Sequence, residues 1–496
     1  MLLMDFLKKD SCLRILSFVS IALLMPAAPS AVAQKHKPKT RAAAEQTKQP
    51  SALPKRDRDP AIIQIIKDVS PQRAQQTDEK LVSFGTRSTL SVNNPGAATS
   101  PQGIVAARNW IKSEFEKISA DCNGCLEVKT DTFIEQPKGP NDRIKQPTEI
   151  QNVYAILKGT DPAQAKRIYL VTGHYDSRNS SNENSTDPAP GANDDGSGTT
   201  VSIECARVVS KHKFPATIIF LTVAGEEQGL NGSTHFAKMA KEQGWQIEGV
   251  LNNDIVGGNT TPGDTLQNKN WVRVYSEGIP SAATDAELRR IKATGGESDS
   301  PSRELARYIH AVSETYDFGL FIPKLMFRRD RYLRGGDHIS FNEQGFPAVR
   351  ITEYREDYNH QHQNVRTENG IEYGDLLKFV DFDYVANVAR MNAATLAALA
   401  SSPAPPAEVR LLTKQLENDS KIVWKPAPGA TAYEVLWRKT TDADFSEENL
   451  QRTTETKVDL TDSKDNVIFG VRSVDAKGHR SLIVVPEPER VPEPER

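Results

Sequence analysis

Histidine and acidic side chains recur in five segments in the middle of this chain, at the end of apolar runs or beside Gly-rich turns. In the first segment, residues 172–177, His174 is followed two residues later by Asp176. Such an imidazole can bind a metal through one ring nitrogen while the carboxylate orients the other. Taken alone the pattern is weak, because a surface histidine beside a turn aspartate is common.

The second segment is a Gly-rich loop, residues 190–198, that carries Asp194 and Asp195 just before an expected helix. Aspartate in such a place often does no more than cap the helix. Glycine on both sides also lets the backbone turn sharply around an ion. One carboxylate of this loop is therefore a candidate bridge between two cations.

The third segment places Glu226 and Glu227 directly after an apolar run, residues 216–223. Burying adjacent carboxylates there is costly unless positive charge lies nearby. A metal supplies that charge, and it allows one glutamate to act as a ligand while the other acts as a base.

Two later segments complete the set. Asp254 lies at the end of another apolar run, and residues 357–363 contain His360 and His362. Imidazole nitrogen together with carboxylate oxygen suits zinc, which also leaves a position open for water. Each segment is ambiguous by itself, but five of them at predicted strand ends indicate a metal centre.

The elements that must position these residues are short, β-branched apolar runs separated by helix-like stretches. Continuous runs of this kind predict strands buried on both faces of a largely parallel sheet. Ligands of such sheets bind where strands end and loops begin. The runs are residues 167–172, 216–223, 250–255, 271–275 and 348–352, and helical periodicity is found at 61–66 and 103–118.

Together these segments resemble the secreted two-zinc aminopeptidases of metallopeptidase family twenty-eight, which includes bacterial leucyl aminopeptidases. The motifs that carry the resemblance are G-H-x-D-S, P-G-A-x-D-D-G-S-G, E-E-x-G-L-x-G-S, N-x-D and a late histidine. The resemblance covers about residues 62–400. It implies an α/β fold, an α/β/α sandwich around a mixed, largely parallel eight-stranded sheet. It also implies a hydrolase with two Zn2+ ions that cleaves the N-terminal peptide bond of peptides or proteins with a zinc-bridged water and a glutamate base.

Carried over to this sequence, the resemblance implies a metal-binding role for five residues and a catalytic role for two. His174 would bind one zinc, Asp194 would bridge both, and Glu227, Asp254 and His360 would each bind one; Glu226 would be the base and Asp176 the partner of His174. The family usually shows H-T-x-x-D at the last ligand, and Asn364 stands where the acid would follow His360. His362 lies close, so the choice between the two histidines stays open. Asp337 and His338 match a further family element that supports the pocket.

Two other functions stay open. A two-zinc carboxypeptidase or dipeptidase needs a cation for the substrate carboxylate, and the basic stretch 328–334 could supply one. A non-catalytic binding protein on a peptidase fold would be expected to have lost Glu226 or a ligand, and none is missing.

The remainder of the chain predicts an exported protein of several parts. Residues 1–33 have the charged start, short apolar core and small-residue site of a signal peptide, with an uncleaved interfacial helix as the alternative. The predicted parts that follow are a flexible leader (34–60), the zinc peptidase domain (61–400), a Pro-rich linker (401–406), a small all-β sandwich domain (407–485) and a Pro-Glu tail (486–496). The tail is expected to stay extended and solvated. We expect a periplasmic or extracellular location and no membrane contact after signal cleavage.

The β-rich segment resembles a fibronectin type III domain around Trp424 and Tyr433, and it is a candidate for binding a surface or a protein partner. In an oxidising compartment, Cys122 and Cys125 are expected to form a small disulfide loop. The net charge is -3, with acids and bases nearly balanced. This balance argues against nucleic acid as a partner.

Overall fold

The computed structural model describes residues 58–316, 319 and 321–489, and all of them belong to one compact unit, Pro54–Arg496. The predicted signal peptide and nearly all of the predicted leader lie outside the described residues, as does the end of the Pro-Glu tail. Within the described part of the chain, no helix is both long and apolar enough to cross a membrane.

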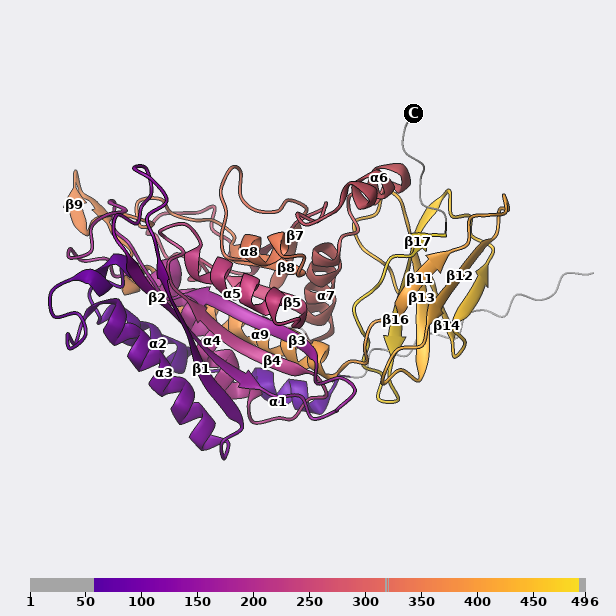
Figure 1. Cartoon of the computed structure of the whole chain (residues 1–496), viewed down its shortest axis with the longest axis horizontal. Helices are drawn as coiled ribbons and strands as arrows, with labels where there is room; N and C mark the ends of the chain where they lie inside the picture. The colour runs from indigo at the N-terminus through magenta and orange to yellow at the C-terminus, as the bar shows by residue number, and fades with distance from the viewer. Residues whose placement is uncertain (1–57, 317–318, 320, 490–496) are drawn as a thin grey trace, which may run out of the picture. The chain divides into compact units, whose positions relative to one another are not determined.

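An eight-stranded mixed sheet forms the centre of the fold (Figure 1), with the strand order β1-β2-β4-β3-β5-β8-β6-β7. Strands β4, β3, β5 and β8 are parallel neighbours, whereas β1, β2 and β6 each join by antiparallel pairing. The strands are β1 (Leu126–Glu135), β2 (Thr148–Leu157), β3 (Arg167–His174), β4 (Thr217–Val223), β5 (Gln246–Asn253), β6 (Trp271–Ser276), β7 (Ile322–Met326) and β8 (Ala348–Glu353). Every residue of β3 and β4 is buried, as continuous apolar runs predict.

Helices cover both faces of this sheet, so the predicted α/β/α sandwich is confirmed. One apolar core joins the sheet to α1, α2, α3, α4, α7 and α9, and a separate core joins the opposite face to α5 and α8. The helices are α1 (Pro60–Asp68), α2 (Pro71–Val82), α3 (Gly103–Asp121), α4 (Gly198–Val209), α5 (Asn231–Glu242), α6 (Asp285–Thr294), α7 (Pro301–Tyr316), α8 (His338–Glu343) and α9 (Phe382–Ser401).

The parallel centre of the sheet brings the predicted site segments to one edge. His174, the last residue of β3, is paired in register with Val223, the last residue of β4. Strand β5 runs parallel on the other side of β3, with Asn252 beside Thr172. The chain therefore leaves all three strands on the same side, just before Asp176, Glu226 and Asp254.

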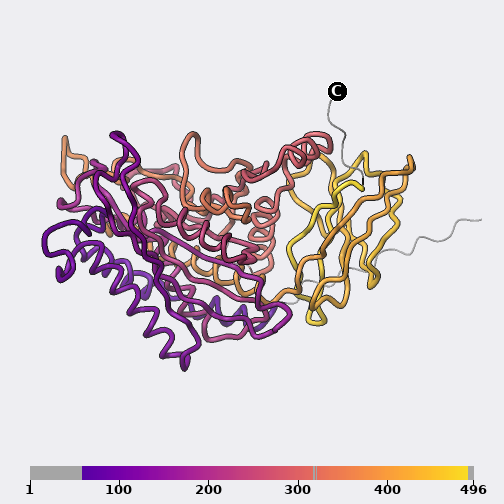
Figure 2. Tube along the Cα trace, viewed as in Figure 1, coloured from indigo at the N-terminus to yellow at the C-terminus, as the bar shows by residue number. Residues whose placement is uncertain are grey.

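After α9 the chain forms two small sheets, which the trace in Figure 2 draws in orange and yellow. Their orders are β15-β12-β11-β17 and β14-β13-β16. Both sheets contribute to one apolar core that includes Trp424 and Tyr433, so this segment is a small β-sandwich. The strands are β11 (Ala407–Leu411), β12 (Ser420–Lys425), β13 (Ala432–Lys439), β14 (Leu450–Thr453), β15 (Lys457–Leu460), β16 (Val467–Val474) and β17 (Glu487–Pro488).

Two details bear on the sequence-based expectations. The disulfide between Cys122 and Cys125 is formed, as predicted. The start of the Pro-Glu tail, expected to stay solvated, pairs instead with β11 through β17. The resemblance of the sandwich to fibronectin type III stays a prediction.

Candidate active site

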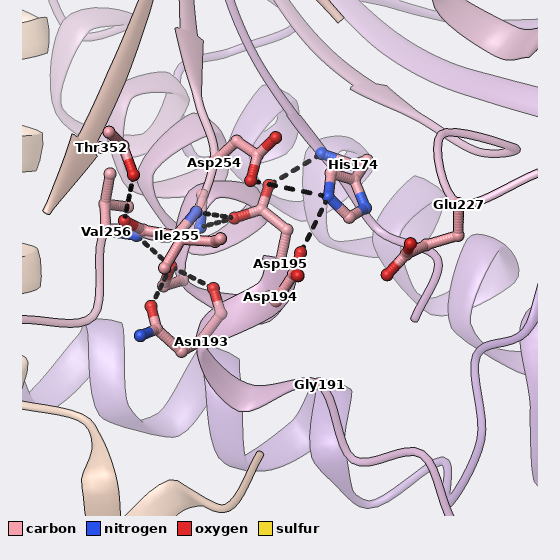
Figure 3. A network of polar contacts seen from close by, with 12 residues as sticks. His174, Gly191, Asn193, Asp194, Asp195, Glu227, Asp254, Ile255, Val256 and Thr352 are labelled. Atoms are coloured by element: carbon pink, nitrogen blue, oxygen red, sulfur yellow. Dashed lines mark hydrogen bonds and ion pairs between the residues drawn. The ribbon is translucent and has the colours of Figure 1, made fainter. Parts of the chain in front are cut away.

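The first cluster of metal-binding side chains lies at the end of β3. His174 Nε2 is 3.2 Å from Asp194 Oδ1 and 3.9 Å from Asp254 Oδ1. Figure 3 shows both carboxylates turned toward the imidazole ring. All three residues are buried, and their donor atoms are close enough together to hold one metal ion.

The second cluster shares Asp194 with the first. His362 Nε2 lies 2.8 Å from Asp194 Oδ2 and 3.0 Å from Glu227 Oε1. Asp194 therefore presents one carboxylate oxygen to each cluster, in the position of a bridge. Burial of Asp194 raises the pKa of its carboxyl, but His362 and His174 outweigh this effect and hold the pKa well below its usual range.

The loop that carries Asp194 is fixed by groups from distant parts of the chain. The carboxylate of Asp375 accepts hydrogen bonds from the backbone N–H groups of Asn193 and Asp194, at 2.8 and 2.7 Å. Burial raises the pKa of Asp375 to about 7. The buried guanidinium of Arg87 donates to three backbone carbonyls, those of Tyr175, Pro190 and Gly191, at 2.7, 2.5 and 2.8 Å.

Asp195, the neighbour of the bridging residue across a cis peptide bond, binds backbone instead of metal. Its carboxylate accepts from the N–H groups of His174, Gly198 and Ile255, at 2.9, 2.9 and 3.2 Å. These contacts join the end of β3, the start of α4 and the residue after Asp254. Asp195 therefore fixes the positions of three site segments relative to one another.

Asp176 lies where the sequence places it, beside His174. Its Oδ1 is 3.4 Å from His174 Nδ1, and its backbone carbonyl is 3.1 Å from the same nitrogen. Its Oδ2 accepts hydrogen bonds from Thr89 Oγ1 and from the backbone N–H of Glu227, at 3.0 and 3.2 Å. Asp176 thereby couples the orientation of the His174 ring to the position of Glu227.

Arginines contact the outer oxygens of Glu227 and Asp254, the two carboxylates that each belong to a single cluster. Arg178 Nε donates to Glu227 Oε2 at 2.8 Å, and Arg350 Nη1 pairs with Asp254 Oδ2 at 2.6 Å. Arg178 Nη2 also lies 2.5 Å from His362 Nδ1. Glu227 and Asp254 are thus each left with one oxygen facing the site.

Glu226 lies beside both clusters but belongs to neither. It lines the cleft in front of them. Burial raises the pKa of its carboxyl well above the usual value. The nearby His174 lowers this pKa, whereas repulsion from Glu227, Asp254 and Asp337 raises it further. A carboxylate that takes up a proton readily is suited to act as a general base.

The chemistry of the two clusters fits zinc. Imidazole nitrogens and carboxylate oxygens are the donors that zinc accepts. Glu227 Oε1 is buried and faces His362 Nε2 in the second cluster, with no further hydrogen-bond partner among the described residues. Three carboxylates packed this closely repel one another, and a divalent cation would offset that repulsion.

The structure corrects the last predicted ligand. The ring of His360 stacks on Phe379, with centroids 3.6 Å apart, and it is part of neither cluster. His362 takes the expected place in the second cluster, and its backbone is left-handed, with φ of 55°. The hairpin of β9 (Arg366–Glu368) and β10 (Ile371–Tyr373) follows His362 and leads to Asp375.

Asp337 and His338 lie near the clusters without joining them. His338 Nε2 lies 2.9 Å from the carbonyl of Arg329, and burial lowers its pKa to about 4. Burial raises the pKa of Asp337 to about 7. Both positions agree with a supporting role and not with that of a ligand.

An open cleft with a volume of about 400 Å3 leads to the clusters. Its lining includes Asp194, Glu226, Glu227, Asp254 and His362 together with Leu230, Leu333 and four arginines. Four residues of the site lie outside the predicted set: Arg87, Arg178, Arg350 and Asp375. The one available signal was that Arg178 follows the first motif by a single residue.

Comparisons with known proteins bear directly on this region. The family model described as Peptidase family M28 matches residues 152–381. A probable zinc metalloprotease of Pyrenophora tritici-repentis is 44% identical over 429 residues, which cover 86% of each chain. One from Pyricularia oryzae is 43% identical over 433 residues, or 85% of this chain and 83% of the relative.

Solved structures with a similar fold include the LapA aminopeptidase of Legionella pneumophila. It is 22% identical, with a TM-score of 0.47, and the match covers 71% of this chain and 78% of that one. BSAP, a zinc aminopeptidase from Bacillus subtilis, is 16% identical, with a TM-score of 0.44 and coverage of 66% and 94%.

The segment matched by the family model contains every residue of both clusters, as well as Glu226, Asp176 and Asp375. The curated relatives extend the similarity over most of the chain at well above 30% identity. Since the donor set also fits zinc, this chain belongs to peptidase family M28 and is a zinc metalloprotease.

Proposed function

We propose that the enzyme is an aminopeptidase with two zinc ions, one in each cluster. The observation that carries this proposal is the position of Asp194, whose two oxygens face two different sets of ligands. When bound, a pair of zinc ions polarises the scissile carbonyl and makes water more acidic. Each remaining role falls to a side chain of this protein.

Glu226 is the general base of the proposed reaction. It lines the cleft and belongs to neither cluster. It would take a proton from the attacking water and deliver it to the amine that leaves. Asp176, Arg178 and Arg350 would act indirectly, by fixing His174, Glu227 and Asp254.

The charges next to the clusters favour binding of a substrate amine. Asp194, Glu227 and Asp254 are at most 5% exposed and lie at the base of the cleft with Glu226. The arginines that contact the carboxylate groups of these ligands, Arg178 and Arg350, are already paired with them. A carboxypeptidase would need a cation there that is available to the terminal carboxylate of the substrate. Among the described residues, these arginines are therefore not available to a C-terminal carboxylate, which favours the substrate amine as the group bound there.

A pair of blocked peptides separates the candidate functions. The zinc-loaded enzyme would be given one tripeptide with a free N-terminus and an amidated C-terminus, and the same sequence acetylated at the N-terminus with a free C-terminus. We expect release of the first residue from the former and no cleavage of the latter. The opposite pattern would show a carboxypeptidase, and no cleavage of either would favour a binding protein. Glu226→Gln, purified in parallel, controls for contaminating peptidases.

A further inference from the structure

Four arginines line the cleft, and two of them are fully occupied by the protein itself. Arg178 contacts Glu227 and His362, as described above, and donates from Nη1 to the carbonyl of Asn179 at 3.4 Å. Arg331 donates from Nε to Asp330, from Nη1 to Glu356 and from Nη2 to the carbonyl of Gly335, at 3.1, 2.8 and 3.2 Å. Neither guanidinium has a nitrogen left for a substrate.

The other two arginines use only part of their hydrogen-bonding capacity. Arg143 donates from Nη1 to the carbonyl of Glu227 at 2.6 Å. Arg334 donates from Nη1 to Glu356 Oε2 at 3.0 Å and to the hydroxyl of Tyr358 at 3.4 Å. Within the part of the chain that the structure describes, Nε and Nη2 of both residues have no hydrogen-bond partner.

These two arginines also lie farther out than the acids. The side chain of Arg334 is 32% exposed and Arg143 is exposed, whereas the carboxylate ligands are buried. The cleft therefore has an acidic base and a basic outer part.

The charge of the cleft also favours an anionic substrate. The lining contains four arginines and four carboxylates, Asp194, Glu226, Glu227 and Asp254. Zinc would offset the charge of its ligands Asp194, Glu227 and Asp254. Loading with divalent cations therefore removes much of the negative charge that would repel an anionic substrate, although Glu356 already offsets part of the charge of Arg331 and Arg334.

We infer that Arg143 and Arg334 recognise a carboxylate of the substrate, so that the enzyme prefers peptides with negative charge near the N-terminus. A guanidinium with two free nitrogens matches the planar geometry of a carboxylate. The carboxylate comes either from an acidic side chain or from the C-terminus of a very short peptide. This inference rests on the proposed aminopeptidase activity, which places the substrate amine at the zinc clusters.

Four substrates with the same first residue test the inference. Leu-Ala-amide is neutral beyond the N-terminus, Leu-Glu-amide adds a side-chain carboxylate, Leu-Ala adds a C-terminal carboxylate, and Leu-Lys-amide adds a positive charge. We expect kcat/KM for at least one carboxylate substrate to exceed that for Leu-Ala-amide by roughly three- to tenfold, as for a partly exposed ion pair. The ratio should fall as salt is added.

The variants Arg143→Gln and Arg334→Gln should lower this ratio toward one, and Arg334→Lys should retain part of it because the charge remains. Arg328→Gln is the matched control, since Arg328 is an exposed arginine of the same loop that does not line the cleft. Zinc content is measured for every variant. If Arg143→Gln loses zinc through its contact with Glu227, the result with Arg334→Gln decides.

Equal hydrolysis of all four substrates, or a preference for Leu-Lys-amide, would overturn the inference and leave the proposed aminopeptidase intact. An acid preference that survives both glutamine variants would overturn the assignment to these arginines. If none of the four peptides is hydrolysed by the zinc-loaded enzyme, the proposed function fails and the inference fails with it.

Discussion

At the scale of single residues, His174, Glu227 and Asp254 each have one polar atom facing the site and a second polar atom in contact with a neighbouring side chain. Asp176 lies against the outer nitrogen of His174, Arg178 holds the outer oxygen of Glu227, and Arg350 holds that of Asp254. Such outer contacts fix which atom of the side chain faces the metal. The same arrangement explains how adjacent glutamates can differ in role, because only Glu227 is held in this way.

This difference predicts opposite effects of two isosteric substitutions. Glu226→Gln should retain zinc but lower kcat by at least roughly 10²-fold, because an amide keeps the shape but cannot accept the proton. Glu227→Gln should lose zinc, since a neutral amide no longer offsets the charge of the ion. Zinc content and turnover, measured on both purified variants, check the prediction. Zinc loss in Glu226→Gln with full occupancy in Glu227→Gln would reverse the two assignments.

The sequence predicted most of these residues but not their supports. His174, Glu227 and Asp254 lie in motifs at strand exits, and Asp194 lies in a Gly-rich motif just before α4, so local patterns place them. His360 and His362 are two residues apart in an irregular loop, where only the backbone turn decides which ring faces the site. Arg87, Arg350 and Asp375 reach the site from distant segments through contacts that no local pattern encodes.

At the scale of elements, the site depends on a close approach between the start of α4 and the end of β5. A Cβ atom on Gly198 would lie 2.2 Å from the carbonyl oxygen of Asn253 and 2.5 Å from both carboxylate oxygens of Asp195. Only glycine leaves room for this contact. It brings the helix that follows Asp194 against the strand that precedes Asp254.

Gly198→Ala should therefore destabilise the protein and disturb the first cluster. Overpacking of this kind typically costs about 1 to 3 kcal/mol. Urea unfolding of the metal-free protein, together with the zinc retained at equal free zinc, measures both effects. Gly296→Ala is the matched control, because its Cβ would meet nothing closer than 3.4 Å. Equal stability of the two variants would contradict the proposed packing role.

Strands were predicted well where the sheet buries them on both faces and poorly at its margins. The runs that became β3, β4, β5, β6 and β8 are apolar enough to stand out. Strand β1 lies at the edge, with several exposed polar residues, so its sequence has no continuous apolar run. The antiparallel pairing of β1, β2 and β4 is set by tertiary contacts and not by any motif.

At the scale of the whole molecule, the C-terminal sandwich contributes to a buried charge cluster of the catalytic part. Arg438 of β13 pairs with Asp299, and the two side chains are 2% and 4% exposed. Arg307 of α7 lies 3.5 Å from the same carboxylate and donates to the carbonyl of Ala443 at 2.8 Å. The sandwich is therefore expected to stabilise the enzyme even though it supplies no site residue.

Removing one partner of this buried pair should lower stability without changing the chemistry. Arg438→Gln leaves Asp299 with Arg307 alone, and we expect a loss of about 3 kcal/mol, near the low end for a broken buried pair. Turnover per folded molecule should stay the same. Arg452→Gln is the control, because Arg452 is 49% exposed in its pair with Glu434 and should cost less than about 1 kcal/mol. Equal thermal unfolding of both variants would contradict this account.

The most direct test of the central claim is an anomalous difference map at the zinc edge from crystals of the zinc-loaded enzyme. The account predicts two peaks, about 3.5 to 4 Å apart, on either side of the Asp194 carboxylate. One peak should contact His174 and Asp254, and the other Glu227 and His362, with His360 remote from both. A single peak, or a second peak held by His360, would contradict it.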